Sequence, residues 1–206
     1  LEEQGDSLMT KDPGSDVNTQ IEQIQDMIGA EVDAVFLCPV DWEAITPALE
    51  ALEEADIPVI NLDTEVKDAD YITAFVGSDN RNAGYVCGED LIEKKPDGGR
   101  IVIVESASVN SVIERITGFE EAISNAGFEV VQRIDAGGDM SAVKSAVAEI
   151  IQSGEQIDAI MCGNDQMAEQ VLAALSEAGN SDPLVYSVDG SPVTKSALMD
   201  PGSPME

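Results

Sequence analysis

The stretches V-D-A-V-F-L-C-P-V-D (32–41) and I-P-V-I-N-L-D (57–63) have counterparts later in the chain, in I-D-A-I-M-C-G-N-D (157–165) and P-L-V-Y-S-V-D (183–189). Each copy is an apolar run opened by an acidic residue, then an amphipathic segment, then a second apolar run that ends on aspartate. The interval from Asp33 to Asp63 is 30 residues, and that from Asp158 to Asp189 is 31. This order predicts two βαβ halves with acids at matching strand ends, and so two similar lobes that share one ligand.

The same alternation of strand and helix continues over the rest of the chain. Apolar runs predict strands at 7–11, 34–37, 59–62, 72–76, 101–104, 129–134, 159–161 and 184–188. Helical spacing predicts helices from 15 or 16 to 28, at 42–54, 82–94 and 112–125, from 139 or 141 to 151, at 165–178 and, as one turn, near 195–199. Near-continuous apolar strands are typical of parallel sheets covered by helices. The expected fold is therefore α/β, with two Rossmann-like lobes, 1–77 and 78–206, around a ligand cleft.

The charge of the chain is strongly one-sided. Ten Lys and Arg residues face 41 Asp and Glu residues among 206, a formal net charge of −31. Such a field repels phosphate backbones and anionic bilayers, so nucleic acid and membrane insertion are not expected. Most acids fall on predicted helix faces and loops, which is typical of a solvated surface.

Cysteine and histidine usage excludes several classes of site. The three cysteines are far apart and histidine is absent, so neither a Cys/His zinc site nor a disulfide framework is indicated. Without histidine there is no Ser-His or Cys-His pair, and no phosphate-binding glycine motif occurs. We therefore expect no catalytic residue, no metal and no cofactor.

The ends of the chain suggest a fragment. The chain opens without Met on L-E-E-Q-G (1–5), interpreted as the last turn of a helix with Gly5 as its C-cap. We interpret the whole as truncated at both ends, with address signals lost from its front.

Candidate ligand contacts follow the predicted strands, because ligands of open α/β sheets bind beyond the carboxyl ends of the strands. Asp63 and Asp189 end matching strands, Asn164 opens a helix, and Arg115 lies on the helix after the strand at 101–104. Each has a simpler alternative: the aspartates and Asn164 as caps, Arg115 as a surface ion pair. Carboxylate, amide and guanidinium groups around one crevice suit a neutral sugar or polyol.

At these strand ends the chain resembles the type 1 periplasmic binding proteins, in particular the sugar-binding, ribose-binding-protein-like branch that serves ABC transporters. The resemblance lies in I-P-V-I-N-L-D (57–63), V-G-S-D-N (76–80) with the helix of Gly84, E-R-I-T-G-F-E-E-A (114–122), G-N-D-Q-M-A (163–168) and V-Y-S-V-D-G-S-P (185–192). These segments occur in the order of that family across nearly the whole chain.

The resemblance implies sugar contacts for Asp63, Arg115, Asn164 and Asp189. It also implies a departure from the ribose-type pattern at Cys38, where that pattern has Asn. Thr64 stands where that pattern has Arg, and Gly138 where it has an aromatic residue. Without the Asn amide, the Arg guanidinium and the aromatic ring of that pattern, the sugar ring should be recognised differently. We expect Cys38 and Thr64 to line the site.

The function that the resemblance implies is solute capture by two closing lobes for an ABC transporter permease, by a monomeric protein outside the cytoplasm, either periplasmic or lipid-anchored. Alternatives are the effector domain of a lac-repressor-type regulator, a sensor ectodomain, an autoinducer-binding relative and, least favoured, an enzyme on a Rossmann-like sheet. The resemblance also implies that the first lobe is incomplete, without its first strand and its C-terminal return. We therefore expect it to be less stable than the second lobe, because its central sheet lacks neighbours.

Overall fold

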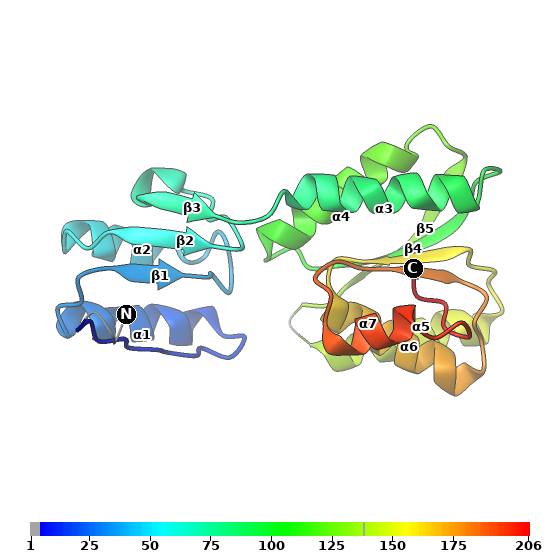
Figure 1. The fold of residues 1–206 in the computed structure, drawn as a ribbon. Coiled ribbons are helices and arrows are strands. Elements are labelled where there is room, and N and C mark those ends of the chain that lie inside the picture. Colours follow the sequence, from blue (N-terminus) through cyan, green and yellow to red (C-terminus); the bar gives the residue numbers. More distant parts are fainter. Residues whose placement is uncertain (1–4, 138) are drawn as a thin grey trace. The chain divides into compact units, whose positions relative to one another are not determined.

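The computed structural model describes residues 5–137 and 139–206, so the interpretations of residues 1–4 and of Gly138 lie outside the described residues. The chain divides into two compact units, Leu1–Gly77 (unit 1) and Ser78–Glu206 (unit 2). Each unit contains a parallel sheet flanked by helices (Figure 1), and the predicted α/β class is confirmed.

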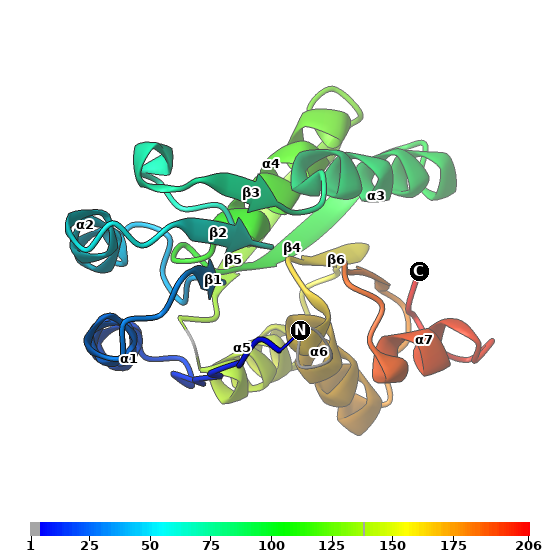
Figure 2. The same cartoon turned by 60° about the vertical axis from the view of Figure 1, so that its left-hand side comes forward.

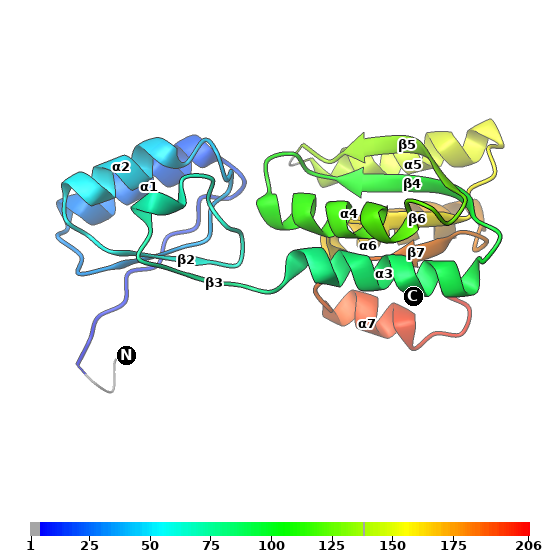
Figure 3. The same ribbon diagram turned by 90° about the horizontal axis from the view of Figure 1, so that it is seen from above.

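Unit 1 is built on a three-stranded parallel sheet with the strand order β1-β2-β3. Its elements are α1 (Val17–Gly29), β1 (Val35–Leu37), α2 (Thr46–Glu54), β2 (Val59–Leu62), the 3₁₀ turn η2 (Ala69–Tyr71) and β3 (Ala74–Val76). Helices α1 and α2 lie on the same face of the sheet (Figures 2 and 3). Their apolar stripes bury Ile24, Leu49 and Leu52 against Leu37 and Val59. Because β1 and β2 are parallel neighbours, their carboxyl ends lie together at one edge.

The strand predicted at 7–11 is wrong. Among the described residues this segment pairs with no strand, and its apolar side chains Leu8 and Met9 are 63% and 45% exposed. A strand needs a neighbour for its backbone N–H and C=O groups, and apolar residues alone do not supply one.

Unit 2 is built on a four-stranded parallel sheet with the order β5-β4-β6-β7. Its elements are α3 (Asn80–Lys94), β4 (Gly99–Glu105), α4 (Asn110–Ile123), β5 (Phe128–Asp135), α5 (Met140–Ser153), β6 (Ala159–Cys162), α6 (Asp165–Ala178), β7 (Leu184–Tyr186) and α7 (Pro192–Leu198). Helices α3 and α4 cover one face of the sheet, and α5 and α6 cover the other (Figure 1). The central strand β6 is buried along its whole length, as its uninterrupted apolar run requires.

Two element boundaries differ from the predictions for identifiable reasons. Helix α2 begins at Thr46 rather than 42, because the Asp41 carboxylate accepts hydrogen bonds from the N–H groups of Glu43 and Ala44 and forms a turn there. Strand β7 ends at Tyr186 rather than 188, because its pairing with β6 stops at Met161 and Tyr186.

Helices α3 and α4 approach each other closely through glycine. A Cβ atom at Gly84 would lie 1.7 Å from the carbonyl oxygen of Arg115, and one at Gly118 would lie 1.9 Å from that of Arg81. Side chains at either position would push the helices apart, since both contacts are with backbone. The glycines therefore determine how near to α3 the backbone of Arg115 lies.

Within residues 5–137 and 139–206 no helix is both long and apolar enough to cross a bilayer. The same residues contain no group of three or more His, Cys, Asp or Glu side chains that could hold a metal ion.

Candidate functional site

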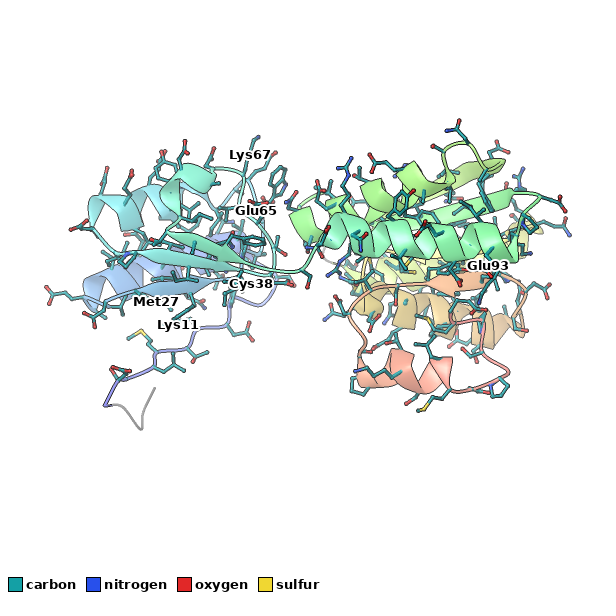
Figure 4. The ribbon with its side chains drawn as sticks, turned by 45° about the horizontal axis from the view of Figure 1, so that its top comes forward. Lys11, Met27, Cys38, Glu65, Lys67 and Glu93 are labelled. Atoms are coloured by element: carbon teal, nitrogen blue, oxygen red, sulfur yellow. The ribbon has the colours of Figure 1, made fainter. Side chains whose placement is uncertain are left out.

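The strand ends of unit 1 bring together three of the predicted residues. Cys38 follows β1, and Asp63 and Thr64 follow the neighbouring strand β2. The Thr64 hydroxyl lies 3.5 Å from Asp63 Oδ2. Partial burial raises the pKa of the Cys38 thiol, the Asp63 charge raises it further, and a hydrogen bond from the Thr64 N–H opposes both. Cys38 is thus held as a neutral thiol beside an exposed carboxylate, at the same end of the sheet as Glu65 (Figure 4).

Two buried amides, which the sequence reasoning missed, position these loops. Gln20 donates to the Cys38 carbonyl and accepts from the Val40 N–H, both at 2.9 Å. Asn61 donates to the carbonyls of Leu37 (3.1 Å) and Thr64 (2.9 Å) and accepts from the Val66 N–H. Asn61 could have been noticed as an amide inside the apolar run I-P-V-I-N-L. Gln20 lies four residues before Ile24, so the two share one face of the helix, and this spacing indicated that Gln20 is buried.

The two aspartates paired by the repeat both have a positive backbone φ. Asp63 has φ 63° and Asp189 has φ 127°, and Glu31 and Asp56 are the other described non-glycine residues with positive φ. Such conformations cost roughly 1–3 kcal/mol each and persist where the surroundings enforce them. Asp63 is held by its N–H bond to the Val76 carbonyl, which ties the end of β2 to β3.

In unit 2 the predicted residue Arg115 is buried, at 5% exposure, and contacts several strand and helix ends. Its guanidinium donates from Nε to Asn80 Oδ1 at 2.8 Å and from Nη1 to the Gly163 carbonyl at 2.9 Å. Nη2 lies 2.9 Å from Asp189 Oδ1. This burial excludes the surface ion pair. Arg115 joins α3, the end of β6 and the end of β7, and Asn80 is a partner that the sequence reasoning missed.

Although these contacts hold Asp189, its carboxylate remains exposed to solvent. Its side chain is 48% exposed although Oδ1 is paired with Arg115. Partial burial raises its pKa; the charge of Arg115 lowers it, and that of Asp165 raises it again. Its remaining lone pairs are therefore available as acceptors for an incoming hydroxyl.

Asn164 caps α6, with Oδ1 accepting from the Met167 N–H at 3.0 Å. The cap occupies its oxygen but leaves the amide N–H₂ group as a donor. The adjacent Asp165 is 3% exposed and accepts hydrogen bonds from Ser187, Ser191 and Thr194. Burial by itself would raise the pKa of Asp165, but these bonds and one from the Gly190 N–H together hold it below its ordinary value.

Each unit thus offers its own set of groups at the carboxyl edge of its sheet. Unit 1 presents the carboxylate of Asp63 with the thiol of Cys38, whereas Thr64 is buried at 2% exposure. Unit 2 presents the Arg115–Asp189 pair and the amide of Asn164. Charged and amide groups of this kind make strong, directional hydrogen bonds to hydroxyl groups, and none of them is arranged as a nucleophile with a base.

Comparison with known proteins gave consistent findings. A family model described as the periplasmic binding protein domain matches residues 1–205. The chain is 26% identical over 197 residues to a ribose import binding protein of Salmonella typhimurium, with 95% of this chain and 66% of the relative covered. It is 30% identical over 211 residues to a galactofuranose-binding protein of Escherichia coli, with 97% and 66% covered.

Solved structures agree with these relatives. The chain matches a crystal structure of a galactofuranose-binding protein with a TM-score of 0.90 and 28% identity, covering 98% of this chain and 72% of that one. It matches the arabinose-transporter binding protein of Shewanella, bound to L-arabinofuranose, with a TM-score of 0.89 and 26% identity, covering 98% and 70%. The chain spans about 66% of the length of the curated relatives named above.

Proposed function

This chain belongs to the family of the periplasmic binding protein domain, and on that premise we propose that it is the solute-binding component of an ABC transporter, capturing a sugar or related polyol. The observation that carries the proposal is the pair of equivalent aspartates, Asp63 and Asp189. Both follow a strand, both have positive φ, and both present an exposed carboxylate. One such residue would be a turn; two at matching strand ends support a ligand contact in each unit.

The residues proposed to contact the ligand are Asp63 and Cys38 from unit 1 and Arg115, Asn164 and Asp189 from unit 2. Asp63 and Asp189 accept from sugar hydroxyls, and Asn164 donates to them. Arg115 has three of its five donors engaged with protein, so it contributes at most its two remaining N–H groups and otherwise orients Asp189. Thr64 acts from its buried position by fixing Cys38 and Asp63.

Furanose-form sugars are the first candidates within this class. Relatives and solved structures named for galactofuranose and arabinofuranose support that choice. The family also supports a site of action outside the cytoplasmic membrane, with a transporter permease as the macromolecular partner. The net charge of −31 disfavours a nucleic-acid partner, and we propose a monomeric binding protein rather than an enzyme.

A thermal-shift screen of the full natural chain tests the proposal. The panel contains galactofuranosides, L-arabinose, D-ribose, other monosaccharides, polyols and furanosyl autoinducers. Ligand at about 100 times its Kd adds about 2.7 kcal/mol of stability, which raises Tm by roughly 5–10 °C for a protein of this size. Asp63→Ala and Asp189→Ala should abolish the gain, whereas Asp182→Ala, an exposed aspartate in the loop before β7, should keep it. No gain with any sugar or polyol would contradict the proposal.

A further inference from the structure

The loop that carries Asp189 has a strained backbone, which contacts with the rest of unit 2 must stabilise. After β7 ends at Tyr186, Asp189 has φ 127° and Gly190 has φ 82°. An aspartate at this φ is unfavourable by itself, so its conformation must be enforced by contacts of the loop with the rest of unit 2.

Those contacts converge on one buried side chain, that of Asp165. Its carboxylate accepts from the hydroxyls of Ser187 and Thr194 and from the N–H of Ser191, and the Gly190 N–H helps to lower its pKa. The donors lie on both sides of Asp189 in the sequence, so a single anion clamps the two ends of the strained loop.

The same residue also acts on Asp189. The backbone N–H of Asp165, at the start of α6, lowers the pKa of the Asp189 carboxyl. Arg115 Nη2 contacts that carboxylate at 2.9 Å. Asp189 is thus paired with one guanidinium donor, beside the N-terminus of α6.

The carboxylate of Asp165 is turned toward protein donors rather than toward a ligand. A carboxylate offers about four lone-pair positions; Ser187, Ser191 and Thr194 occupy three of them, and only 3% of the residue is exposed. Its position as the first residue of α6 further favours the charged form.

We propose that Asp165 is a positioning residue, which holds the 187–191 loop so that Asp189 keeps its ligand-facing conformation. The statement that Asp189 faces a ligand rests on the proposed function. The statement that Asp165 positions the 187–191 loop does not depend on it.

Amide hydrogen exchange of the full chain, followed by NMR, measures the hold without a ligand. In Asp165→Asn the amide group replaces one acceptor by a donor that faces other donors, so exchange at Gly190 and Ser191 should accelerate at least about tenfold. Amides of Ile101 and Val104 in β4 report on the unit as a whole and should change much less. Asp182→Asn, which removes the same charge at an exposed site, should leave the loop amides unchanged.

A second pair of variants covers the case in which Asp165→Asn unfolds the unit. Thr194→Val keeps the shape but removes one donor to Asp165, whereas Thr194→Ser keeps the donor and removes a methyl group. The inference predicts faster exchange at Gly190 and Ser191 in Thr194→Val and parental exchange in Thr194→Ser. Parental exchange in Thr194→Val, or equal acceleration in both variants, would overturn it, because the second result reports packing alone.

Affinity separates this inference from the proposed function. With L-arabinose as the probe, or the panel sugar that gives the largest thermal shift, Thr194→Val should bind at least about tenfold more weakly and Thr194→Ser within about threefold of the parent. Parental affinity in a Thr194→Val protein whose loop is loosened would overturn the positioning role. A parent that binds no panel sugar would overturn the proposed function, and the exchange data would still decide the hold on the loop.

Discussion

Replacement of Gly84 by alanine tests how the helix pair α3–α4 positions Arg115. The new Cβ would lie 1.7 Å from the Arg115 carbonyl oxygen, 2.6 Å from its carbonyl carbon and 2.9 Å from its Cα. Normal contact requires the α4 backbone to retreat by roughly 1.5 Å. That displacement would lengthen the 2.8 and 2.9 Å hydrogen bonds from Arg115 to Asn80 and Gly163 beyond bonding range.

The expected cost follows from two opposing terms. Overpacking against backbone costs about 3 kcal/mol, the upper end of the usual range, because no side chain can rotate away. Alanine is about 1 kcal/mol better than glycine in a helix, so the net loss of unfolding free energy is about 2 kcal/mol.

Hydrogen exchange with mass spectrometry reads the two units separately. Peptides from β4 and α4 should exchange roughly thirtyfold faster in Gly84→Ala, and peptides from unit 1 should not change. The matched control is Gly29→Ala in α1, where the new Cβ meets nothing within 4 Å, and a gain of up to about 1 kcal/mol is expected there. If Gly84→Ala were as stable as the parent, the close approach of the helices would not position Arg115.

Three further predictions concern the charges and the units. The Arg100 N–H, at 2.9 Å, and then Lys95 lower the pKa of Asp158 against the effect of burial. A lowered carboxyl pKa stabilises the fold above the ordinary pKa of about 4, so in urea titrations the penalty of Asp158→Asn should be full at pH 7 and disappear as the pH falls through the lowered pKa. A penalty that does not depend on pH would contradict this. Because the net charge is −31, raising KCl from about 0.05 to 1 M should raise Tm by several degrees, whereas a fall in Tm would show that the screened ion pairs matter more than self-repulsion. We also expect limited proteolysis to cut unit 1, with its three-stranded sheet, before unit 2; equal resistance of both units would refute this.

Local sequence patterns predicted correctly those helices and strands whose first and last residues are fixed by a cap, a glycine or a proline. The bounds predicted for α6 agree with the structure, because Asn164 supplies its N-cap and Gly179 ends it in the left-handed conformation. Strand β2 was also predicted at its observed bounds, between Pro58 and Asp63. The segment at 7–11 has the composition of a strand but no partner among the described residues, and composition carries no information about partners.

The site was predictable only as a set of residue types at strand ends. The bonds of Arg115 to Asn80 and Gly163 span 35 and 48 residues of sequence, and no local pattern encodes which distant groups meet. Asp165 illustrates the limit. Sequence reasoning assigned a role to its neighbour Asn164 but none to Asp165, whose donors Ser187, Ser191 and Thr194 lie 22 to 29 residues later in the chain.

The most direct test of the account is isothermal titration of the full natural chain with the panel sugar that gives the largest thermal shift. Parent, Asp63→Asn and Asp189→Asn proteins are compared, because the account requires one carboxylate from each unit. Each variant should lose at least about tenfold in affinity, as expected for one charge-assisted hydrogen bond. Parental affinity in either variant would show that the equivalent aspartates do not both hold the ligand, and would contradict the claim that both units contribute to binding.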